Sequence, residues 1–169
     1  APNPGSLADK NHMWIDNSPG SPYEGYLYVA WTNFGGSDDA EIALAYSHDD
    51  GETWTQAKVP VRSSIVDIDF PTSQLGWAVG HEGVILHSMD GGETWEHRGL
   101  AETHTIARIV VHPEDSDTVY VAASGNEWTT NPERGVYRTR DGGGNWVKVL
   151  SVDDEAGDLI DRLMVQVRE

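Results

Sequence analysis

SHDDGETW, at residues 47–54, returns twice along the chain, as SMDGGETW at 88–95 and as TRDGGGNW at 139–146. Each copy has Ser or Thr first, Asp third, Gly fifth and Trp eighth. The three Asp positions, 49, 90 and 141, are 41 and then 51 residues apart. This spacing is typical of a repeated supersecondary unit. The chain is therefore predicted to contain one structural unit three times.

The repeated motif has the chemistry of a hairpin turn. An alternating apolar run precedes each copy, such as Ile42 to Tyr46, and another short strand-like stretch follows. A short carboxylate accepts hydrogen bonds from backbone N–H groups of its own turn, and Gly takes the positive φ that the turn demands. The Trp is predicted to return to the core and anchor the hairpin.

With these features the motif resembles the Asp-box or BNR repeat of sialidases, sortilin-type receptors and photosystem II assembly factors. The resemblance implies a β-propeller whose Asp boxes join the third and fourth strands of each blade, at the outer rim and away from the central site. The residues that take this structural role by resemblance are Ser47, Asp49, Gly51, Trp54, Ser88, Asp90, Gly92, Trp95, Thr139, Asp141, Gly143 and Trp146.

The predicted fold class is all-β, with propeller blades of four antiparallel strands in one segment over residues 1–169. The blades are expected over residues 12–60, 64–99 and 105–151. Their strands are expected near 12–17, 25–34, 41–47, 54–60, 64–70, 75–82, 83–88, 95–99, 105–112, 117–124, 134–140 and 145–151. Ile160 to Val165 repeats the pattern of Ile106 to Val111, so a further blade is expected to begin near 158–166.

Three blades and a strand are too few for a closed propeller, which typically has about four to eight blades. The simplest closed solution with cyclic symmetry is a homodimer that forms a six-bladed ring. The blades also resemble different members of the Asp-box family. Residues 12–59 resemble secreted BNR-repeat proteins, residues 64–99 resemble the photosystem II assembly factor, and residues 103–166 resemble sortilin-like proteins. An engineered or recombined chain accounts for this difference, and so does uneven divergence within one natural gene.

The composition argues against several classes of partner. The chain has 28 acidic and 11 basic residues and a formal net charge of −17, so it repels phosphate backbones and anionic lipids, and nucleic acid is not an expected partner. No run approaches the roughly 18 apolar residues that span a bilayer, so membrane insertion is not expected. Cysteine is absent, so redox chemistry does not indicate the compartment.

The inner strands of a propeller line its central channel, and aligning the predicted inner strands places Asp67, Arg108 and Arg162 at equivalent positions. Such a mixed-charge row can orient an ionic ligand, because converging charges in a cleft focus the electric field. It can equally neutralise itself in a wet channel. Asp67 and Asp69 also have the spacing of a carboxylate pair for acid–base chemistry, although alternation along any half-exposed strand produces the same spacing.

A long loop, Gly125 to Arg134, lies between the second and third strands of the third blade. Trp128 in this loop is predicted to be exposed and to contact a protein partner or a sugar, whereas Trp31 and Trp77 are expected to pack between blades. The histidines lack zinc-binding spacing, and acidic pairs such as Asp38-Asp39 lack the calcium-loop signature. We expect no metal site and no cofactor.

Two functions stay open. The first is a non-enzymatic propeller module for self-assembly and for protein or ligand binding, with an engineered propeller that has no natural ligand as a variant of it. The alternative is a sialidase-type glycoside hydrolase, a class that uses three arginines, a Tyr nucleophile with a Glu partner and an Asp acid/base. No arginine occurs in the first 61 residues, where that family's Arg-Ile-Pro signature is expected, so no catalytic residue is assigned.

Overall fold

The computed structural model describes residues 7–17, 19–34, 41–126, 129 and 131–151. These residues form three four-stranded antiparallel sheets, and in each sheet the strands lie side by side in chain order. We call the sheets blade 1 (β1–β4), blade 2 (β5–β8) and blade 3 (β9–β12). The predicted fold class of four-stranded antiparallel blades is confirmed. In this described part of the chain no helix has the length and apolarity needed to cross a membrane.

The strands have the following bounds. Blade 1 contains β1 (Leu7–Ile15), β2 (Leu27–Phe34), β3 (Glu41–Ser47) and β4 (Thr55–Gln56). Blade 2 contains β5 (Ile65–Asp69), β6 (Gly76–Gly80), β7 (Ile85–Ser88) and β8 (Glu96–His97). Blade 3 contains β9 (Ile106–His112), β10 (Asp115–Ala123), β11 (Gly135–Thr139) and β12 (Val147–Ser151).

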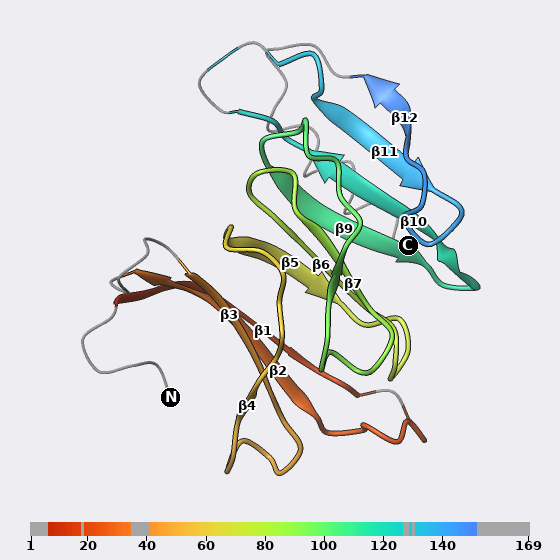
Figure 1. Cartoon of the computed structure of the whole chain (residues 1–169). Helices are drawn as coiled ribbons and strands as arrows, with labels where there is room; N and C mark the ends of the chain where they lie inside the picture. Colours follow the sequence, from red (N-terminus) through yellow and green to blue (C-terminus); the bar gives the residue numbers. More distant parts are fainter. Residues whose placement is uncertain (1–6, 18, 35–40, 127–128, 130, 152–169) are drawn as a thin grey trace.

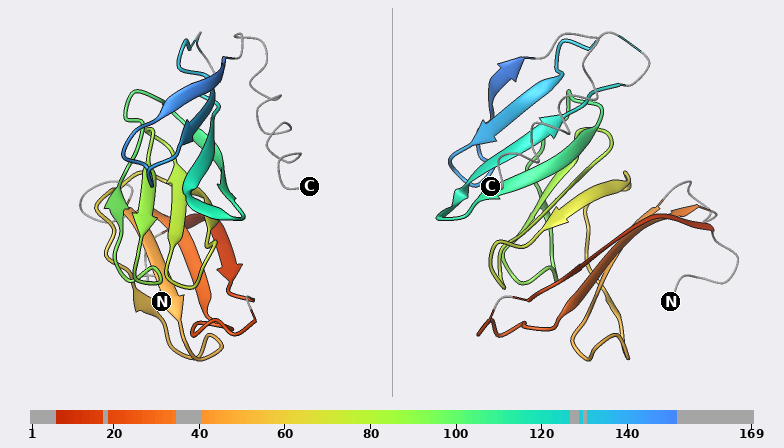
Figure 2. Two further views of the ribbon diagram at one scale, coloured as in Figure 1. Left: turned by 90° about the vertical axis from the view of Figure 1, so that its right-hand side faces the viewer. Right: turned by 180° about the vertical axis from the view of Figure 1, so that it is seen from behind.

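The three blades follow one another in space as they do in the sequence, with blade 2 between the other two (Figures 1 and 2). The first strand of each blade contacts the first strand of the next, so that β5 touches both β1 and β9. These three inner strands are the ones that line the centre of a propeller. We call the face that a blade turns toward the next blade its front, and the opposite face its back.

Aromatic side chains fill the space between blades 1 and 2. The strand register aligns Trp14, Tyr28 and Tyr46 in one row on the front of blade 1. The ring of Phe70 from blade 2 stacks on Trp14 and on Tyr28, with ring centroids 5.0 and 4.3 Å apart. Trp95 belongs to the same buried cluster. Burial of such large rings stabilises the contact between the two sheets.

Aliphatic side chains dominate the space between blades 2 and 3. Trp77 on the front of blade 2 is fully buried and shares a cluster with Ile109 and Val121 of blade 3. Trp77 therefore lies between blades. Trp31 does not, because strand alternation and the pairing of its neighbour Val29 with Met13 place it on the back of blade 1, where it is half-buried.

Two details of the strands differ from the sequence-based prediction. The strand β1 begins at Leu7 rather than near residue 12, because its pairing with β2 continues past an irregularity between Asp9 and His12. Such a break interrupts the alternation on which the prediction depends. The outer strands β4 and β8 have two residues each. Beyond β4 the chain leaves its sheet, and Lys58 pairs instead with Thr94 of blade 2.

Candidate functional site

The three Asp-box turns share one hydrogen-bond pattern. In the first, the Ser47 hydroxyl and the Thr53 backbone N–H both donate to Asp49 Oδ1, each at 2.8 Å. The Gly51 N–H donates back to Ser47 Oγ at 2.9 Å. Gly51 has a φ of 88°, a conformation that Gly adopts without steric cost. Each turn is thereby closed by side chains of its own motif.

The same bonds recur in blades 2 and 3. Asp90 Oδ1 accepts from the Ser88 hydroxyl at 2.8 Å and from the Thr94 N–H at 2.9 Å. In blade 3, Asn145 replaces Thr and donates through its backbone N–H at 2.8 Å and its side-chain amide at 2.7 Å to Asp141. The Thr139 hydroxyl donates to Asp141 Oδ1 at 2.7 Å.

These hydrogen bonds favour the ionised form of each Asp-box carboxyl. Donation by Asn145 and Thr139 lowers the pKa of Asp141 to about 2, and donation by Thr53 lowers the pKa of Asp49. Burial opposes ionisation of Asp90, but hydrogen bonds from Thr94 and Ser88 outweigh it, so the pKa of Asp90 is also lowered. Because the donors lie within the same turns, these charges belong to the architecture of the hairpins.

The Trp that ends each motif does not have the same surroundings in the three blades. The indole N–H of Trp54 donates to Gly51 O at 3.1 Å and that of Trp95 to Gly92 O at 2.9 Å, both within their own turn. The indole N–H of Trp146 instead donates across to Arg98 O of blade 2, at 2.8 Å. The third Asp box therefore also joins two blades.

The second polar feature is a row of side chains along the inner strands. The register places His12, Asp67 and Arg108 at equivalent positions, each opposite a small or branched residue of the second strand, namely Ala30, Val79 and Ala122. The sequence alone predicts the alignment of Asp67 with Arg108. His12 is a new member that only the observed register reveals, because β1 lacks a clean apolar alternation.

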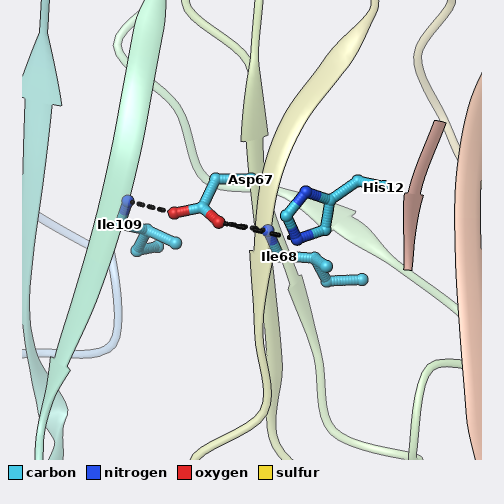
Figure 3. Close-up of polar contacts among 4 residues, drawn as sticks. All are labelled: His12, Asp67, Ile68 and Ile109. Carbon is cyan, nitrogen blue, oxygen red and sulfur yellow. Dashed lines mark hydrogen bonds and ion pairs between the residues drawn. The ribbon is translucent and has the colours of Figure 1, made fainter. Parts of the chain in front are cut away.

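Asp67 connects all three inner strands (Figure 3). Its Oδ2 accepts a hydrogen bond from the Ile109 N–H of β9, and its Oδ1 accepts one from the Ile68 N–H of its own strand, both at 3.1 Å. On the other side, His12 Nε2 of β1 lies 3.9 Å from Asp67 Oδ1. The Asp67 side chain is 14% exposed, so these contacts form in a partly desolvated place.

Arg108 has a different position from the one that a compact charge ring would need. Within the described residues no ion pair joins Arg108 to Asp67, whose oxygens are directed to His12, Ile68 and Ile109. Arg108 is half-buried on the front of blade 3. Two further residues of the predicted site, Arg162 and Trp128, and the strand expected near 158–166 lie outside the described residues.

A small cavity lies at the rim of blade 2, which the sequence did not predict. It has a volume of about 220 Å³, and its lining residues are His87, Met89, Asp90, Thr94 and Glu96. Burial, with Arg98 nearby, lowers the pKa of His87, and its ring packs on Trp77 with centroids 4.2 Å apart. The described residues contain no group of three His, Asp or Glu side chains arranged to hold a metal ion.

Four-stranded blades joined by inner strands and closed at the rim by Asp-box turns define a segment of an Asp-box β-propeller. A family model described as Photosynthesis system II assembly factor YCF48 matches residues 46–149, which is more than half of the chain. The chain belongs to this family. The match includes all of blade 2, blade 3 up to residue 149, and all three Asp boxes.

Individual relatives agree with this assignment. The chain is 43% identical over 54 residues to the chloroplastic photosystem II stability/assembly factor HCF136 of Cyanidioschyzon merolae, a stretch that covers 31% of this chain and 12% of the relative. The chain therefore spans a small part of that protein. Other family members from Guillardia theta and Thermosynechococcus vestitus are likewise covered over 15% and 19% of their length.

Solved structures share the fold. YCF48 from Cyanidioschyzon merolae has a TM-score of 0.57 at 18% identity, covering 95% of this chain and 42% of that one. A structure of YCF48 bound to D1 peptide has a TM-score of 0.52 at 19% identity, covering 86% and 43%. A GH74 xyloglucanase from Xanthomonas campestris has a TM-score of 0.60 at 16% identity, covering 81% and 23%. At such identities the likeness establishes the propeller fold alone.

Proposed function

We propose that this chain is a non-enzymatic propeller module that binds a peptide segment of a protein partner at the inner strands of its blades. The observation that carries the proposal is the row of His12, Asp67 and Arg108 on adjacent inner strands, in a chain of the photosystem II assembly factor family. One solved structure of that family holds a D1 peptide. Peptide recognition at the propeller centre is the function that fits both facts.

Arg108 is the residue that we assign to the partner. Asp67 already accepts two backbone hydrogen bonds, whereas Arg108 is a half-buried residue on the front of blade 3. A guanidinium binds carboxylates with two parallel hydrogen bonds, which are strong when partly desolvated. The whole protein carries a net charge of −17, so the Arg108 position attracts an acidic group that most of the surface would repel.

The test is binding of a fluorescently labelled D1 peptide, followed by anisotropy. We expect Arg108→Ala to weaken binding by roughly tenfold or more, since a charge-assisted hydrogen bond contributes about 1.5–3 kcal/mol. Arg138→Ala is the matched control, because Arg138 lies on the same face of blade 3 but on the third strand, β11, away from the inner strand. No binding by the unaltered protein, or an equal loss in both variants, would contradict the proposal.

Self-assembly is the second part of the proposal. It rests on the exposed apolar side chains of Met13, Ile15 and Trp54 in blade 1 rather than on Arg108. The sialidase-type hydrolase stays the alternative. It predicts turnover of a fluorogenic sialoside that Arg108→Ala abolishes, whereas the module proposed here has no turnover to lose.

A further inference from the structure

The small cavity at the rim of blade 2, which we call the rim cavity, contains a buried histidine without a hydrogen bond. The lining residues are His87, Met89, Asp90, Thr94 and Glu96. His87 is only 9% exposed and packs on Trp77. Within the part of the chain that the structure describes, neither ring nitrogen of His87 has a hydrogen-bond partner. Buried polar side chains in native folds are usually hydrogen-bonded, so this one indicates a ligand.

The equivalent corner of blade 1 is built differently. By strand register, the counterpart of His87 is Tyr46, whose ring packs on His48 with centroids 4.8 Å apart. The counterpart of Glu96 is Thr55, which carries no charge. The rim cavity is thus lined by a smaller ring and one more carboxylate than the same place in blade 1.

The two carboxylates of the rim cavity are partly occupied by hydrogen bonds of the fold. Asp90 Oδ1 accepts from the Ser88 hydroxyl and the Thr94 N–H, which uses both of its lone pairs. Asp90 Oδ2 accepts only from the Thr94 hydroxyl. Arg98 donates to Glu96 Oε2 at 2.8 Å, and Oε1 has no partner among the described residues. Each carboxylate therefore keeps one oxygen for a ligand.

The remaining acceptors fit the donors of an ammonium group. Burial lowers the pKa of His87, so the ring is uncharged at neutral pH and one nitrogen has a free lone pair. With Asp90 Oδ2 and Glu96 Oε1, the cavity offers three single acceptors from three side chains. A primary ammonium has three donors and no acceptor. Met89, which is 63% exposed, adds an adaptable apolar surface for an alkyl chain.

We propose that the rim cavity binds a primary ammonium group on an alkyl chain, as in a lysine side chain of a protein partner or in a free alkyl amine. A guanidinium fits less well, because it binds a carboxylate through two parallel hydrogen bonds, and neither Asp90 nor Glu96 has two unused oxygens. The rim cavity lies on the outer strands of blade 2 and attracts the charge opposite to that attracted by Arg108. It is therefore independent of peptide binding at the inner strands.

The first test is titration with Nα-acetyl-lysine methylamide at neutral pH, followed by NMR of the Met89 methyl group and the His87 ring. We expect saturable shifts of both signals, and weaker binding of the arginine analogue of the probe. Glu96→Gln should weaken binding by roughly two- to fivefold, as for an exposed ion pair. Glu93→Gln is the matched control, because Glu93 is an exposed residue of the same hairpin that does not line the cavity.

Two further measurements complete the test. His87→Phe keeps an aromatic ring against Trp77 but removes the acceptor, so it should weaken binding while circular dichroism shows a folded protein. Pentylammonium has the charge and an alkyl chain but no peptide groups. Tighter binding of the lysine derivative identifies a protein partner as the source, and equal or tighter binding of pentylammonium identifies a free amine.

Three results would overturn the proposal of an ammonium site. They are the absence of saturable shifts with both amines, equal affinity for the arginine analogue, and equal effects of Glu96→Gln and Glu93→Gln. None of them bears on the binding of D1 peptide, which Arg108→Ala tests separately.

Discussion

Each Asp-box carboxylate is stabilised by hydrogen-bond donors from its own turn, so protonation of these individual residues is expected to destabilise the fold in acid. The pKa of Asp141 falls from 3.8 to about 2 on folding, and the pKa values of Asp49 and Asp90 fall as well. A carboxyl with a depressed pKa stabilises the folded state above its unfolded pKa. That stabilisation is lost as the pH decreases from about 4 toward 2.

We therefore expect Asp141→Asn to lower the midpoint of urea unfolding at neutral pH and to reduce the loss of stability between pH 4 and pH 2. The amide cannot accept as the carboxylate does, and it does not titrate. Asp50→Asn is the control, since it removes the same charge from the first Asp-box turn, one position after the motif Asp49. The φ of Asp50 is 54°, which Asn tolerates. An unchanged acid dependence in Asp141→Asn would contradict this account.

At the scale of the elements, the third Asp-box hairpin closes its own turn and also packs on the neighbouring blade. Gly143 of blade 3 packs under Arg98 and Trp77 of blade 2, so a Cβ at Gly143 would lie 3.0 Å from the Arg98 Cβ and 3.2 Å from the Trp77 ring. A Cβ at Gly51 of blade 1 would meet nothing closer than 3.5 Å. The φ values are 85° and 88°.

Gly143→Ala is accordingly expected to destabilise the protein more than Gly51→Ala. Both substitutions carry the strain of a positive φ, about 1–2 kcal/mol, and only Gly143→Ala adds overpacking, about 1–3 kcal/mol. Urea titration gives the free energy of unfolding of each variant. The difference between the two variants measures the cost of disturbing the contact between blades 2 and 3. Equal losses in the two variants would show that the third hairpin does not pack on blade 2 as described.

On the scale of the whole molecule, Asp67 connects the three inner strands. Its carboxylate accepts from the N–H of Ile109, a fully buried residue of β9, and faces His12 of β1. The hydrogen bond to a buried N–H is the stronger of the two links, because an unsatisfied buried donor is costly. The link to His12 contributes less, since that side chain is 38% exposed and 3.9 Å away.

Asp67→Ala should lower the free energy of unfolding by about 1–3 kcal/mol and speed hydrogen exchange at the Ile109 amide. His12→Gln, which keeps Asp67 and its bond to Ile109, should change stability by less than about 1 kcal/mol. Urea titration and amide exchange measured by NMR provide both readouts. A His12 substitution as damaging as the loss of Asp67 would mean that the ion pair, and not the backbone bond, holds blade 1 to blade 2.

Contacts within a few residues were predictable from the sequence, because one motif contains both partners. The acceptor role of Asp49, the positive φ of Gly51, the hairpin position of the motif and the all-β class follow from residue types and spacing alone. The tertiary structure decided the contacts between blades. His12 joined the row of Asp67 and Arg108 only through register, and Trp146 bonded to Arg98, 48 residues away, because such contacts depend on how one sheet packs on the next.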